Sequence, residues 1–248
     1  MTDRFSQLAS GSALPAAAAS ELQERGFVIV PGPVPPDRME RLASAYDAVM
    51  ASATGDDLKV GSTTTRVSDF VNRGVEFDDL YIFPPLLEAC RHVIDGPFRL
   101  SSLLGRTLRA NQPPQDLHVD VRCDSVDWPL LGFILMVDEF RTDNGATRFV
   151  PGSHLWPGPP EDSVSDRRAN HDDQVLACGE AGSLVVFHGA TWHGHSANTS
   201  GKPRRSIQGF FVPHAGRAGT DFDARMSPAT RERLSPLAHQ VLGTRPHS

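Results

Sequence analysis

Residues 115–121, QDLHVDV, place a histidine and an aspartate two positions apart among apolar residues. In an extended strand, side chains at i and i+2 project from the same face, so His118 and Asp120 would point together. An imidazole and a carboxylate side by side can hold a metal ion, or they can hydrogen bond to each other on a solvated strand face. The pair alone does not choose between these two interpretations.

Further histidines downstream are candidates for a third ligand. The segment at residues 182–211, GSLVVFHGATWHGHSANTSGKPRRSIQGFF, contains His188, His193 and His195, followed by two arginines that lead into a strand. A distant histidine that completes a set of two imidazoles and one carboxylate is typical of non-haem Fe(II) oxygenases. Such a site leaves coordination positions open for a chelating cosubstrate and O₂. Spacing alone leaves all three histidines as candidates.

These motifs, in this order, resemble the phytanoyl-CoA dioxygenase-like family of Fe(II)/2-oxoglutarate-dependent oxygenases. The matching segments are GFVIVPG (26–32) with the helix after it, HVD, DNGATRFVPGSH (143–154) and WHGHSANTSGKPRRS (192–206). Together they cover most of the chain from about residue 22 to residue 214. The last two segments are much more specific than HVD.

The resemblance implies the iron ligands His118, Asp120 and His193, and it implies Fe(II), 2-oxoglutarate and O₂ as cofactor and cosubstrates. His193 is preferred because the family's His-Gly followed by small residues falls there, with the arginine pair after it. His195 is the rival third ligand, and His188 is a weaker one. Two neutral imidazoles and one carboxylate leave a net positive charge on Fe(II), which favours an anionic bidentate ligand such as a 2-oxo acid.

The far carboxylate of 2-oxoglutarate needs a cationic partner in a buried pocket, and a guanidinium can pair with it bidentately. Arg204 and Arg205 are adjacent, so on a strand they face opposite sides. Arg204 shares its face with Ser206, and Arg-x-Ser is the family's pattern for binding this carboxylate. The resemblance therefore assigns the carboxylate to Arg204 and Ser206. The alternative is that both arginines are surface charges after a turn.

Three further residues are candidates for the pocket. Thr147 matches a position that offers a hydroxyl to the cosubstrate in some relatives, and Phe133 is expected to pack near the cosubstrate. Arg122 follows Asp120 by two positions, so an extended strand would point it to the ligand side, where it could bind an anionic group of the substrate. Each has an ordinary alternative: a strand threonine, a core phenylalanine and a solvent-facing arginine at a strand end.

The elements that must position these residues are mostly short strands. The 21 glycines and 20 prolines indicate frequent turns. A strand at 26–32 and two helices, near 36–51 and 84–94, come first. After residue 97 the pattern predicts strands in FRLSSLLGRTLRA, LHVDVRC, LLGFILMVDEF, ATRFVPGS, GSLVVFHG and RRSIQGFFVPH. This predicts a mainly β chain with helical N-terminal support, α+β in class, whose core is a double-stranded β-helix or jelly roll.

The domain prediction is simple. We expect a flexible lead-in at residues 1–20 and a single Fe(II)/2-oxoglutarate oxygenase domain at 21–248. Residues 52–80 contain several glycines and show no clear periodicity, which suits a lid that orders over bound ligand. Substrate choice is expected in this segment and just after the metal strand.

Composition restricts the partners. A net charge of -6 and a pI near 5.9 argue against nucleic acid or an anionic membrane as the main partner. The three cysteines are widely spaced and suggest no disulfide framework, which fits a reducing cytoplasm. The N-terminus resembles neither a signal peptide nor a membrane span. We therefore expect a cytoplasmic chain that acts on a small molecule.

The leading hypothesis is a dioxygenase that hydroxylates, or otherwise oxidises, an unactivated C–H bond of a small molecule and releases succinate and CO₂. A halogenase on the same scaffold is disfavoured because Asp120 occupies the coordination site that halide needs. A non-catalytic ligand-binding sensor would be signalled by loss of a ligand or of Arg204, and neither is lost. A zinc hydrolase could use two histidines and an aspartate, but it has no need of the Arg-x-Ser pair.

Overall fold

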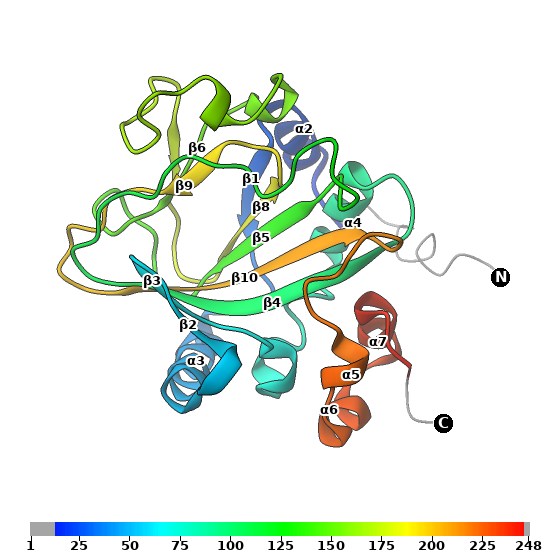
Figure 1. Ribbon diagram of the computed structural model, residues 1–248. Coiled ribbons are helices and arrows are strands. Elements are labelled where there is room, and N and C mark those ends of the chain that lie inside the picture. The colour runs from blue at the N-terminus through cyan, green and yellow to red at the C-terminus, as the bar shows by residue number, and fades with distance from the viewer. Residues whose placement is uncertain (1–12, 246–248) are drawn as a thin grey trace.

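The computed structural model describes residues 13–245, and its strands form two sheets that pack against each other (Figure 1). The larger sheet runs in the order β1 (Phe27–Pro31), β8 (Ser183–His188), β5 (Leu131–Met136), β10 (Arg204–Pro213), β4 (Phe98–Leu108), β3 (Thr64–Val67) and β2 (Leu58–Val60). The smaller sheet runs in the order β7 (Val175–Ala177), β6 (Thr147–Phe149) and β9 (His193–His195). All of these pairings are antiparallel. The predicted mainly β, jelly-roll core is confirmed.

One predicted strand is absent. The segment 117–123, which carries the His-x-Asp pair, forms no regular strand. Instead His118 makes an isolated antiparallel bridge to His193 of β9. Two reciprocal backbone N–H···O=C hydrogen bonds of 3.0 Å each close this bridge. The local alternation is still useful, because Leu117 turns away into a small apolar cluster with Val150 and Trp192.

Alternation along β5 separates two apolar cores. All six residues of this strand are buried. Leu131, Phe133 and Leu135 belong to the main core, which the helices cover. Ile134 and Met136 belong to a second core between the two sheets. A fully buried side chain of this size contributes about 1.5–3 kcal/mol, so both faces of the strand hold the larger sheet in place. The space between the sheets is where inward polar residues can be gathered.

Three helices from the first part of the chain cover the main core: α2 (Ala16–Arg25), α3 (Met39–Ser52) and α4 (Pro84–Val93). The predicted helices at 36–51 and 84–94 are confirmed by α3, with the 3₁₀ turn before it, and by α4. Helix α2 begins inside the expected lead-in at 1–20, and residues 1–12 of that lead-in lie outside the described residues. Within residues 13–245 no helix has the length and apolar character needed to cross a membrane.

Three short helices follow the last strand, and the sequence analysis did not predict them. They are α5 (Phe222–Arg225), α6 (Pro228–Arg233) and α7 (Pro236–Leu242), which lie below β4 in the view of Figure 1. Two of them start at Ser-Pro pairs, where the hydroxyl of Ser227 or Ser235 accepts a hydrogen bond from a backbone N–H of the first turn. A serine cap followed by proline at the first helical position is the signal that could have found them.

The segment 52–80, expected to act as a lid, is built into the fold. It contains β2 and β3, which extend the larger sheet beside β4. It also buries Phe70, Val71 and Phe77 in the main core. The segment therefore has apolar anchors of its own in the main core, and its role as a lid stays a prediction.

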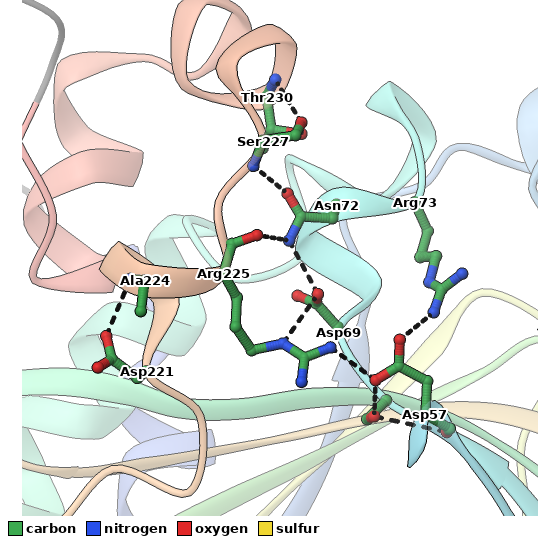
Figure 2. Close-up of polar contacts among 10 residues, drawn as sticks. Asp57, Asp69, Asn72, Arg73, Asp221, Ala224, Arg225, Ser227 and Thr230 are labelled. Atoms are coloured by element: carbon green, nitrogen blue, oxygen red, sulfur yellow. Dashed lines mark hydrogen bonds and ion pairs between the residues drawn. The ribbon is translucent and has the colours of Figure 1, made fainter. Parts of the chain in front are cut away.

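A network of charged and polar groups ties this segment to α5 and the start of α6 (Figure 2). The guanidinium of Arg225 pairs with Asp57 at 2.6 Å and with Asp69 at 3.2 Å. The side chain of Asn72 donates to Asp69 and to the carbonyl of Arg225, and it accepts from the backbone N–H of Ser227. The C-terminal helices therefore help to fix the position of the β2–β3 hairpin.

Candidate active site

Inward side chains of both sheets surround a cavity. Five of the predicted site residues line it: His118, Asp120, Thr147, His193 and Arg204. They come from the 117–123 segment, from β6 and β9 of the smaller sheet, and from β10 of the larger one. The fold therefore gathers residues that are up to 86 positions apart in the sequence into one cavity.

The His-Asp-His group has the geometry of a metal site. The ligand atoms of His118, Asp120 and His193 all lie within 4.8 Å of one another. Nε2 of His193 is 3.4 Å from Oδ2 of Asp120, and Nε2 of His118 is 3.9 Å from Oδ1. The backbone bridge between residues 118 and 193 sets this spacing, because it holds the two Cα atoms side by side.

Backbone carbonyls fix the tautomers of both histidines. Nδ1 of His118 lies 3.0 Å from the carbonyl oxygen of Asp116, and Nδ1 of His193 lies 2.8 Å from that of Thr191. A carbonyl can only accept, so each Nδ1 carries the hydrogen, and each Nε2 keeps its lone pair. Carbonyls in this position orient and strengthen metal-binding imidazoles. Both lone pairs are thus prepared for a cation before one binds.

The electrostatics of the group favour a cation as well. Burial lowers the pKa of His118 and of His193 to about 4, so both imidazoles are neutral and able to coordinate. Burial also raises the pKa of Asp120, although the nearby His118 and Arg106 oppose this. A carboxylate held where solvent does not fully stabilise its charge gains most from a divalent metal ion. Two imidazoles and one carboxylate with open positions suit Fe(II).

The two rival histidines are occupied elsewhere. His195 lines the cavity, but its Nδ1 donates to the carbonyl of Ser196 at 2.9 Å and its Nε2 accepts from the hydroxyl of Thr63 at 3.0 Å. His188 is outside the cavity, where its ring packs against Trp128. Among the described residues, the ligand atoms grouped with those of His118 and Asp120 are those of His193, so the geometry favours His193 as third ligand.

Arg204 lines the cavity and has no acidic partner within ion-pair distance among residues 13–245. It is 3% exposed, donates to the carbonyl of Gly145 at 2.8 Å, contacts the hydroxyl of Ser206 at 3.4 Å, and stacks on the ring of Phe140. Gly145 has φ of +79°, a conformation that favours glycine and that aims this carbonyl inward. Burial lowers the pKa of Arg204 to about 9, which leaves the guanidinium charged at neutral pH.

The Nε of Arg204 is buried and makes no hydrogen bond within the described part of the chain. A buried guanidinium with an unpaired N–H fits the far carboxylate of 2-oxoglutarate. The neighbouring Arg205 has a different environment. It faces the other side of β10, and its guanidinium pairs with Asp138 at 2.6 Å and with Asp47 at 2.7 Å. The strand-face argument from the sequence thus separates the two arginines correctly.

Two other predicted residues lie elsewhere. Phe133 is fully buried, but it points to the helix-covered face of β5 and packs against Phe211. Its neighbour Ile134 lines the cavity instead, since successive strand residues face opposite sides. The side chain of Arg122 is 53% exposed and lies near Asp124 and Glu161, outside the iron-site cavity. Without a regular strand at 117–123, the i+2 argument does not extend to Arg122.

Sequence reasoning missed several polar residues of the cavity. The cavity is also lined by Arg106 of β4, by Gln208 of β10 and by Gln115, which precedes the 117–123 segment. Nη2 of Arg106 donates to Oε1 of Gln115 at 3.0 Å. A charged residue at an inward position of a largely apolar strand was the available signal for Arg106.

An open groove adjoins the cavity. Gln115 and His118 line both, so they mark the place where groove and cavity meet. Ser62 and Thr63, between β2 and β3, form part of the groove wall. The segment that the sequence analysis linked to substrate choice therefore borders the approach to the candidate iron site.

Comparison with known proteins points the same way. The family model described as phytanoyl-CoA dioxygenase matches residues 22–206. The dioxygenase trt7 of Aspergillus terreus is 29% identical over 253 residues, which cover 93% of this chain and 84% of that protein. The iron/alpha-ketoglutarate-dependent dioxygenase okaE of Penicillium ochrochloron is 23% identical over 244 residues, 90% of this chain and 79% of that protein.

Solved structures share the fold. HygX from Streptomyces hygroscopicus, solved with nickel and 2-oxoglutarate bound, has a TM-score of 0.69 at 16% identity and covers 83% of this chain and 89% of its own. The epimerase SnoN, solved with Fe3+, alpha ketoglutarate and nogalamycin RO, has a TM-score of 0.63 at 21% identity, with 79% and 82% covered. At these identities the likeness establishes the jelly-roll architecture.

Proposed function

Since this chain belongs to the phytanoyl-CoA dioxygenase family, we propose that it hydroxylates an unactivated C–H bond of a small molecule with release of succinate and CO₂. The chain is an Fe(II)/2-oxoglutarate-dependent dioxygenase that uses O₂. The reaction type at the C–H bond and the role of each site residue are parts of the proposal, and the residues that line the cavity support them.

The observation that carries the proposal is the presence of two complementary groups in one cavity. One is a set of three metal-ligand atoms within 4.8 Å of one another, and the other is a buried guanidinium whose Nε has no partner among the residues that the structure describes. Fe(II) needs the first and the far carboxylate of 2-oxoglutarate needs the second. A zinc hydrolase would use the ligands and leave the guanidinium unexplained.

Each residue has a defined task in this proposal. His118, Asp120 and His193 hold Fe(II), which with bound 2-oxoglutarate supplies the O₂-dependent oxidising chemistry. Arg204 binds the far carboxylate and, with the hydroxyl of Ser206, fixes the direction in which the cosubstrate enters the cavity. Thr147 is 5% exposed and offers a hydroxyl in the same cavity.

Asp120 also bears on the choice between hydroxylation and halogenation. Its carboxylate faces both imidazoles and takes the position that a halide would need. The substrate approaches through the groove beside His118, so its reacting C–H bond meets the open side of the metal. We assign all of this to one oxygenase domain over residues 21–248.

The test is an anaerobic titration of Fe(II) and then 2-oxoglutarate into the metal-free protein, observed by visible absorption. A metal-to-ligand charge-transfer band is expected when both are bound, and Asp120→Ala should prevent it. Admission of O₂ should then release succinate. Tight Fe(II) binding without a band on addition of 2-oxoglutarate would contradict the proposal.

A further inference from the structure

Two arginines stand opposite each other on neighbouring strands, and one of them, Arg106, lines the cavity. Arg66 of β3 is the direct partner of Arg106 of β4 in the antiparallel ladder. Directly opposite residues project from the same face, and like charges in this position are destabilising. Gly105, beside Arg106, faces Phe70 and the main core, so Arg106 itself faces the cavity.

Neither arginine has an acidic partner within ion-pair distance among residues 13–245. Arg106 donates to the neutral side chain of Gln115 at 3.0 Å, and Arg66 contacts the hydroxyl of Thr64 at 3.5 Å. Burial lowers the pKa of Arg106 to about 10, and Arg66 contributes to this, yet Arg106 stays protonated at neutral pH. Arg66 is exposed, so solvent screens its charge, whereas the guanidinium of Arg106 is shielded from solvent and would gain most from a bound anion.

The ligands already assigned to the cavity do not supply that anion. The charges of Fe(II) and Arg204 are balanced by Asp120 and the two carboxylates of 2-oxoglutarate. Arg106 then remains as a positive charge in the wall of a cavity that the substrate must enter. Because the charges of Fe(II), Arg204, Asp120 and the cosubstrate balance one another, the substrate is the natural source of an anion for Arg106.

The position of Arg106 also matches the route of the substrate. It lines the cavity together with His118, and its hydrogen-bond partner Gln115 lines both the cavity and the groove. With Nη2 engaged by Gln115, the rest of the guanidinium is left to pair with an oxyanion. A molecule that enters through the groove meets His118 and Gln115, and the guanidinium of Arg106 lies beside Gln115 in the cavity.

We propose that Arg106, supported by Arg66, binds a carboxylate of the substrate, so that the enzyme oxidises a C–H bond of a small organic acid. This inference rests on the proposed function and specifies its substrate class. Arg106 is in this view a specificity-determining residue. Loss of the substrate's charge, with its shape unchanged, would remove most of its binding.

The experiment uses acetate as the probe and acetamide as its uncharged counterpart of the same shape. Each is titrated into the anaerobic complex of the full chain with Fe(II) and 2-oxoglutarate, and the charge-transfer band reports binding. Acetate should perturb the band with a saturable dissociation constant, and acetamide should not. Arg106→Gln should weaken acetate at least about tenfold, the loss expected for a charge-assisted pair. The affinity of the Arg106→Gln variant for 2-oxoglutarate should stay within about twofold of that of the wild type.

Two variants sharpen the comparison. Arg99→Gln is the matched control, because Arg99 lies on the same strand but donates to the carbonyl of Gly216, outside the cavity. It should bind acetate like the wild type. Arg106→Lys keeps the charge and should retain part of the acetate affinity, which a purely structural role for Arg106 would not predict.

Three outcomes would overturn the inference. Equal responses to acetate and acetamide, or unchanged acetate binding in Arg106→Gln, would show that no carboxylate site exists at Arg106. A loss of 2-oxoglutarate affinity in Arg106→Gln as large as the loss for acetate would assign the guanidinium to the cosubstrate. Absence of the band in the wild type would instead remove the proposed function, and this inference with it.

Discussion

His118 and His193 each have Nδ1 held by a backbone carbonyl and Nε2 directed at Asp120. Replacing any of these three residues by alanine should abolish Fe(II) binding and succinate production, because two ligands cannot complete the site. Far-ultraviolet circular dichroism should show an intact fold. His195→Ala should keep the iron site, since both of its ring nitrogens serve other partners. Activity in His193→Ala together with inactivity in His195→Ala would reverse the assignment of the third ligand.

Arg204 and Arg205 are neighbours with different environments, so they form a natural pair of variants. Arg204→Ala should weaken the binding free energy of 2-oxoglutarate by about 2–5 kcal/mol, because a buried charge-assisted pair is lost. This corresponds to a dissociation constant that is roughly 30-fold higher or more. Arg205→Ala removes the ion pairs to Asp138 and Asp47, so it should lower stability and leave 2-oxoglutarate affinity unchanged. Anaerobic titrations of both variants check this. Equal losses of affinity would contradict the role given to Arg204.

Among the elements, β10 was the easiest to predict and the segment at 117–123 the hardest. Regular alternation in β10 was enough to direct Arg204 inward and Arg205 outward. Alternation could not tell which face of β5 would meet the cavity, because both faces are apolar, and Phe133 was placed on the wrong one. It also could not show that β3 and β4 would bring Arg66 opposite Arg106, since register depends on tertiary pairing.

The β2–β3 hairpin depends on a distant element for its position, because Arg225 of α5 bridges Asp57 and Asp69 (Figure 2). Arg225→Gln should increase hydrogen exchange of backbone amides in residues 58–67. It should cost about 1 kcal/mol or less in global stability, since the side chain of Arg225 is 43% exposed. The control is Arg41→Gln, which removes only an exposed pair with Glu76. Unchanged exchange in Arg225→Gln would show that the apolar anchors alone hold the hairpin.

At the scale of the whole molecule, several buried histidines give the metal-free protein a defined response to acid. Burial lowers the pKa of His118, His188, His193 and His195 to about 4, from an ordinary value of 6.5. The unfolded chain therefore takes up protons at higher pH than the folded chain does. Stability is fully present above pH 6.5 and is lost as the pH falls toward 4.

Urea unfolding of the metal-free protein at a series of pH values between about 7 and 5 should show this loss. His188→Gln should reduce the slope of stability against pH, because it removes one of the four groups and is not an iron ligand in our assignment. A slope equal to that of the wild type would mean that His188 titrates normally in the folded protein.

The place of β10 in the larger sheet has a consequence for biosynthesis. This strand lies between β5 and β4, yet it is the last strand of the sheet to be translated. Until it emerges from the ribosome, β5 and β4 each expose an unpaired edge to other chains and to chaperones. Its insertion closes the sheet and at the same time delivers Arg204. A nascent chain would therefore acquire the arginine of the proposed cosubstrate site in the same step that pairs these two inner strand edges.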